Sequence, residues 1–176
     1  MLLVWMKMEI RWKSENMSVL VSDRTESKFE PITFSTEVHN MLREFMQRNF
    51  GVKDLEHFVQ LRYAYGKDDV EDFGKYRYLM LTHKKEIDRL ATLMTNNVRA
   101  ANSIYPTTMR EYEMRRDYQS SAIVNCEQII KELQRVVETF EVDLNVYGRY
   151  VKAIDREIGL IKKWRQRDNK IKSYVQ

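Results

Sequence analysis

The scarcity of helix-breaking residues restricts this chain more than any other feature of its sequence. Its 176 residues include only five Gly and two Pro. Pro interrupts a helix because it lacks a backbone N–H, whereas folds rich in strands need Gly and Pro at many turns. Long stretches without either residue favour helices. We therefore expect an all-α protein.

Apolar residues recur three and four positions apart in several segments, which is the spacing of one helical face. This spacing predicts helices over residues 35–49, 69–103 and 108–140, a further helix from about residue 143, and a shorter one over residues 54–64. The four main apolar seams include Val38, Leu42 and Phe45; Met80, Ile87 and Met94; Ile123, Cys126 and Leu133; and Tyr147, Ile154 and Ile161.

Several residues mark where these helices begin and end. Thr108 followed by Glu111 has the spacing of a capping box at a helix start. Gly51 is suited to ending the first helix, and Pro106 ends the second. Gly148 and Gly159 lie inside the last helix, where close packing against a neighbouring helix is one explanation for them.

Long helices joined by short loops favour an antiparallel up-down four-helix bundle, here with an N-terminal extension. We expect residues 1–32 to form a partly extended arm and residues 33–68 a helical N-terminal segment. Residues 69–176 would form the long-helix core of the bundle. The length fits a single domain overall.

The sequence contains few of the residues that carry catalytic or cofactor chemistry. One Cys and three His are too few for a disulfide framework or a zinc site, and the five Gly are too scattered for a phosphate-binding loop. Neither an enzyme nor a cofactor is expected. No apolar run approaches the roughly 18 residues of a membrane span. We expect a cytoplasmic protein with no membrane partner.

One short pattern suggests catalysis. Arg77 and His83 have the Arg-x5-His spacing of helical ribonucleases of the HEPN type. The alternative is a solvated Arg and a His at the edge of the bundle. Cys126 lies on an apolar seam, where a thiol acts as a small hydrophobic group.

Basic charge is concentrated near the C-terminus. The net charge is +4, and residues 141–176 alone contain nine basic and five acidic groups. Such a stretch suits RNA phosphates, and an aromatic ring within it suits an unpaired base. The alternative is a helix end whose charges complement the helix dipole. The candidate RNA-binding residues here are Lys162, Lys163, Trp164, Arg165, Arg167, Lys170 and Lys172.

A second basic set, Arg110, Arg115 and Arg116, lies near the start of the third helix. In an antiparallel bundle this start lies beside the ends of the second and fourth helices. We therefore predict that these arginines join the C-terminal cluster at one pole.

Several short segments resemble a known family. They are residues 18–20, 24–30, 102–106 and 115–119, together with Cys126. They resemble the accessory variability determinant (Avd) type of four-helix-bundle protein, which is encoded beside reverse transcriptases in bacterial diversity-generating retroelements.

The resemblance implies a basic homo-oligomer, often a pentamer. It implies two partners, a reverse transcriptase and its template RNA or RNA/cDNA, and a non-catalytic role in mutagenic cDNA synthesis. The chain departs from the compact type by its long region 1–68 and its one-sided charge. The alternatives are a HEPN-like ribonuclease using Arg77 and His83, and a purely structural bundle.

Overall fold

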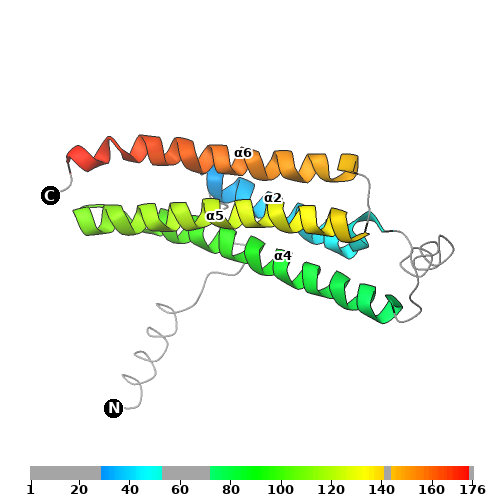
Figure 1. Cartoon of the computed structure of the whole chain (residues 1–176). Coiled ribbons are helices and arrows are strands. Elements are labelled where there is room, and N and C mark those ends of the chain that lie inside the picture. Colours follow the sequence, from blue (N-terminus) through cyan, green and yellow to red (C-terminus); the bar gives the residue numbers. More distant parts are fainter. Residues whose placement is uncertain (1–28, 53–71, 141–143, 175–176) are drawn as a thin grey trace, which may run out of the picture.

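The computed structural model describes residues 29–52, 72–140 and 144–174. Most of the described residues form four long helices, and the expected all-α bundle is confirmed (Figure 1). The predicted helix over residues 54–64 and residues 1–28 of the predicted arm lie outside the described residues. The prediction that the arm reaches residue 32 was wrong, because residues 30–32 belong to the first described helix. The helices are α2 (Glu30–Gln47), α4 (Asp72–Ser103), α5 (Met109–Phe140) and α6 (Leu144–Asp168), with short 3-10 turns η2 (Asn49–Gly51) and η3 (Ile171–Ser173).

The four helices alternate in direction and close into a ring. α4 packs against α2 and α5, and α6 packs against the same two helices. In Figure 1 the end of α4, the start of α5 and the end of α6 lie at the left of the bundle, and α2 begins further in. We call this end of the molecule the basic pole, because it contains the start of α5, with Arg110, Arg115 and Arg116, and the basic run of residues 162–172.

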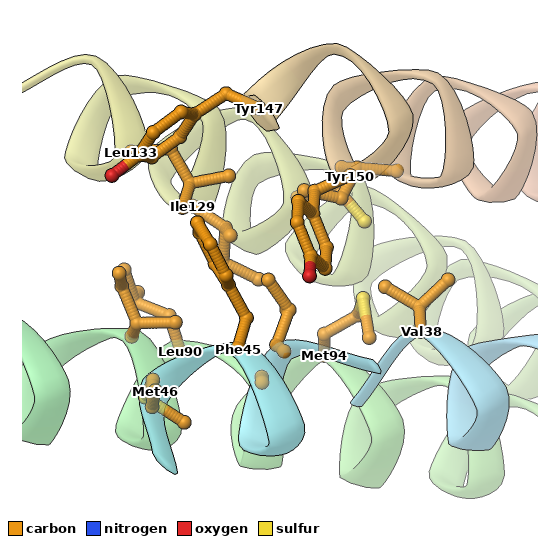
Figure 2. Close-up of a cluster of buried hydrophobic side chains, with 14 of the residues drawn as sticks. Val38, Phe45, Met46, Leu90, Met94, Ile129, Leu133, Tyr147 and Tyr150 are labelled. Atoms are coloured by element: carbon orange, nitrogen blue, oxygen red, sulfur yellow. The ribbon is translucent and has the colours of Figure 1, made fainter. Parts of the chain in front are cut away.

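All four helices contribute to the core at the centre of the bundle (Figure 2). Phe45 of α2 stacks on Tyr150 of α6 with ring centroids 4.1 Å apart, and it meets Tyr147 edge-on at 5.0 Å. The expectation that Cys126 packs in the core is confirmed, because it is fully buried and burial raises the pKa of its thiol. The aliphatic part of the cluster includes Val38, Met46, Leu90, Met94, Ile129 and Leu133.

The predicted capping box at the start of α5 is confirmed. The Glu111 backbone N–H donates to the Thr108 hydroxyl at 3.3 Å, and the Thr108 N–H donates to the Glu111 carboxylate at 3.0 Å. Thr107 adds bonds to the same carboxylate from its hydroxyl and its backbone N–H. These bonds, first that from the Thr107 hydroxyl, lower the pKa of Glu111 to about 2.

Two details differ from the sequence-based predictions. α2 begins at Glu30 rather than residue 35, because Pro31 lies in the first turn, where no intrahelical N–H is needed. A Cβ added at Gly148 or Gly159 would meet nothing within 4 Å. Close helix packing was therefore the wrong explanation for these two glycines.

Candidate nucleic-acid interface

The start of α5, with Arg115 and Arg116, lies against the end of α6 at the basic pole, as predicted. Arg116 of α5 donates to the side-chain oxygen of Asn169 at 2.7 Å, and the Tyr112 hydroxyl lies 3.2 Å from the same oxygen. Asn169 directly follows α6. Residues 53 positions apart are thus in direct contact, and the two basic segments form one surface.

The ten predicted RNA-binding residues differ in exposure, however. Arg116 and Arg165 are half-buried, and Arg115 and Trp164 are more deeply placed. The remaining six are exposed, and they are Arg110, Lys162, Lys163, Arg167, Lys170 and Lys172.

The prediction that Trp164 stacks on an RNA base was wrong. Its side chain is only 2 % exposed. The Phe29 ring meets it edge-on with centroids 4.9 Å apart, and the Arg115 guanidinium lies 4.9 Å from the ring centre. Trp164 follows Ile161 by three residues, so it continues the apolar seam of α6 into the core.

The prediction that Arg115 contacts phosphate was also wrong. Its Nε lies 3.1 Å from a carboxylate oxygen of Asp168, and its side chain is 13 % exposed. The N–H does not point at that oxygen, so the contact is an ion pair without hydrogen-bond geometry. The Gln119 amide donates to the same carboxylate at 2.8 Å. These three residues join α5 to the end of α6, which accounts for the polar start of the α5 seam.

A groove runs between the start of α2 and the outer face of α6. Its volume is about 790 Å³. Three of the exposed candidates, Lys163, Arg167 and Lys170, line it together with Arg156, which the sequence-based prediction missed. Arg156 lies outside the dense basic run, and the helical spacing of these four positions is the signal that would have found it. The other lining residues are Glu30, Pro31, Gly159, Leu160 and Gln166.

Two exposed aromatic residues were also missed. Tyr105 follows the end of α4 and is 83 % exposed, and Tyr174 follows η3 and is 85 % exposed. The end of α4 and the end of α6 both lie at the basic pole (Figure 1), so the two tyrosines that follow them belong to this end of the bundle. Their rings have the accessible faces that Trp164 lacks.

The HEPN-like pair is not brought together. His83 is 8 % exposed, and its Nδ1 lies 2.7 Å from Glu132 of α5. Arg77 is exposed. Six positions on a helix with about 3.6 residues per turn lie about 120° apart around the axis, so the two side chains leave α4 in different directions.

No group of three or more His, Cys, Asp or Glu side chains within the described ranges is arranged to hold a metal ion. None of the helices in those ranges has an apolar stretch long enough to cross a bilayer. The chain matches no protein-family model, no curated protein and no solved structure.

Proposed function

We propose that this protein is a non-catalytic accessory protein that binds a retroelement reverse transcriptase and its template RNA and supports cDNA synthesis. The single observation that carries the RNA-binding part is the contact between the start of α5 and the end of α6, through Arg116 and Asn169. It joins two basic segments into one surface. The bundle fold agrees with the Avd-type resemblance, from which the reverse transcriptase and the homo-oligomer are proposed.

RNA would bind through phosphate contacts and base stacking. The exposed side chains of Arg110, Lys162 and Lys172 supply charge at the basic pole. Tyr105 and Tyr174 supply rings for unpaired bases. A base stacked on an aromatic ring contributes about 1–3 kcal/mol, so stacking and charge together support single-stranded RNA as the ligand.

The RNA-binding part is tested by titrating a labelled single-stranded RNA with the wild type and with Tyr105→Ala/Tyr174→Ala. We expect wild-type affinity to fall steeply with salt, because phosphate contacts release counterions. The double variant should bind about thirtyfold more weakly or worse, because two stacks are lost and each contributes roughly 1–3 kcal/mol.

Tyr78→Ala is the matched control, because Tyr78 is 69 % exposed near the start of α4, away from the basic pole. Its substitution should leave RNA affinity unchanged. Salt-insensitive or absent binding by the wild type would contradict the proposed function and favour the purely structural bundle.

The adaptor part needs a different measurement. A retroelement reverse transcriptase is supplied with its template RNA, with and without this protein, and full-length cDNA is quantified. We expect more cDNA when the protein is present, and less of this gain with the Tyr105→Ala/Tyr174→Ala variant. The same cDNA yield with and without the wild type would rule out the adaptor role.

A further inference from the structure

The groove between α2 and α6 presents a row of cations along one helix. Arg156, Lys163, Arg167 and Lys170 follow each other at intervals of seven, four and three residues, so they share one face of α6 and the turn after it. With a rise of about 1.5 Å per residue, the row is about 21 Å long. A row of this kind can follow one phosphate backbone.

The lining of the groove also includes apolar residues. Pro31 and Leu160 contribute apolar surface, and a Cβ added at Gly159 would meet nothing within 4 Å. Gln166 adds an amide that can both donate and accept hydrogen bonds. A single nucleic-acid strand can turn its phosphates to one side and its bases to the other. The phosphates would then contact the row of cations, and the bases would contact the apolar surface beside it.

One position in the row already has an anionic partner. A carboxylate oxygen of Glu30 lies 3.2 Å from Nη2 of Arg156, and both side chains are 60 % exposed. The Arg156 guanidinium lies 4.2 Å from the centre of the Phe34 ring, which holds it in place. The Glu30 carboxylate thus occupies the position that a phosphate oxygen would take beside Arg156.

The size of the groove favours a single strand over a duplex. Its volume of about 790 Å³ is within the range of pockets for small ligands, about 300–1,000 Å³. A few unpaired nucleotides fit such a space. A duplex has two backbones separated by a groove, and one row of cations can follow only one of them.

We propose that this groove binds the backbone of single-stranded RNA, and that the Glu30 carboxylate competes with the strand for Arg156. The proposal rests on the proposed function and adds to it a specific site and a built-in competitor. Surface ion pairs are weak, about 0–1 kcal/mol, so an incoming phosphate can displace Glu30 readily.

The test uses a fluorescent 12-nucleotide oligo(U) RNA and the full chain over a range of salt concentrations. We expect Lys163→Ala/Arg167→Ala to bind more weakly. The slope of log K against log salt concentration should be shallower by about 1.4, since each of two lost single-strand phosphate contacts contributes about 0.7. Glu30→Gln should bind roughly two- to fivefold more tightly at low salt, in keeping with a surface ion pair of up to about 1 kcal/mol, and this gain should disappear at high salt.

The matched control is Arg77→Ala/Lys85→Ala, which removes the same two charges from exposed positions on α4. An equal loss of affinity in the two double variants would overturn the groove proposal, because only total charge would then matter. Unchanged affinity in Glu30→Gln would also overturn it. All five substitutions replace exposed side chains, and circular dichroism checks that each variant is folded.

Other outcomes separate this proposal from the proposed function. If Tyr105→Ala/Tyr174→Ala weakens binding and Lys163→Ala/Arg167→Ala does not, RNA binding stands and the groove site falls. If the wild type binds no RNA, both fall. If polyglutamate of equal charge displaces the RNA equally well, an acidic protein is the ligand and the RNA site is wrong. A duplex that binds as tightly as oligo(U) contradicts the single-strand preference.

Discussion

At the scale of single residues, Glu157 of α6 differs from the other acidic groups because it is fully buried without a partner. Neither of its carboxyl oxygens has a hydrogen-bond partner in the described part of the chain. Burial, reinforced by the negative charge of Glu30 and opposed by Arg156, raises the pKa of Glu157 from 4.5 to about 8. The carboxyl group is therefore protonated and uncharged in the folded protein at neutral pH.

The raised pKa of Glu157 makes stability depend on pH. Between pH 4.5 and about 8 the folded chain holds a proton that the unfolded chain releases, so the free energy of unfolding should fall as pH rises through this window. With about 1.4 kcal/mol per pKa unit, the loss is on the order of a few kcal/mol. Urea denaturation at pH 5, 6.5 and 8 measures it.

Glu157→Gln should flatten this pH dependence, because the amide does not titrate. Asp155→Asn is the control, since Asp155 is an exposed acid on the same helix. In this variant the free energy of unfolding should depend on pH as it does in the wild type. Parallel pH profiles for the wild type and Glu157→Gln would show that Glu157 is not the group responsible.

At the scale of elements, the turn that directly follows α2 has an unusual backbone. Asn49, Phe50 and Gly51 have φ values of 50°, 57° and 84°. Phe50 tolerates this because its side chain is fully buried against Phe45, with ring centroids 5.5 Å apart. Its carbonyl oxygen also accepts a hydrogen bond from the Tyr147 hydroxyl at 3.2 Å. Burial and hydrogen bonding thus offset the backbone strain and hold the end of α2 against α6.

Two glycine substitutions should have opposite effects. Gly51→Ala should lower the free energy of unfolding by about 1–2 kcal/mol, because an L-residue is strained at positive φ. Gly148→Ala should raise it by about 0.5–1 kcal/mol, because Ala favours the helix and the added Cβ meets nothing within 4 Å. Urea denaturation compares both with the wild type. If both substitutions changed the free energy of unfolding in the same direction, the positive φ of Gly51 would not explain its effect.

At the scale of the whole molecule, the proposed RNA surface is assembled from three helices. The basic pole combines the start of α5 with the end of α6, and the groove adds the start of α2. We therefore expect RNA affinity and the helical circular dichroism signal to be lost over the same range of urea concentration. RNA binding that persists after unfolding would show that the linear run of residues 162–172 is sufficient.

The main elements of the bundle could be predicted from local information. Helices α4 and α5 begin and end within about three residues of the predicted bounds, and α6 begins within about one residue of its predicted start, because breakers and caps act within a few positions along the chain. The apolar seams correctly marked most core positions, such as Val38, Met94 and Ile154. The predicted start of α2 was five residues too late, because the first turn of the helix lies before the apolar seam and contains Pro31.

The candidate site could be predicted only in part. The density of charge along residues 162–172 led to Lys163, Arg167 and Lys170, whose side chains are exposed, and their contact with RNA stays a prediction. It failed for Trp164 and Arg115, because a run of charged neighbours conceals that every third or fourth residue of a helix faces the core. Tyr105 and Tyr174 were missed because nothing local distinguishes an exposed tyrosine from a buried one such as Tyr147.

By itself, the sequence determined the helices, their apolar faces and the end of the chain where the charge gathers. These depend on local propensity and on a period of about 3.6 residues. Only the tertiary structure decided the partners of each side chain. The pairing of Arg115 with Asp168, the burial of Glu157 and the approach of Glu30 to Arg156 all join residues from packed helices, and helix spacing along the chain does not specify which neighbour each face meets.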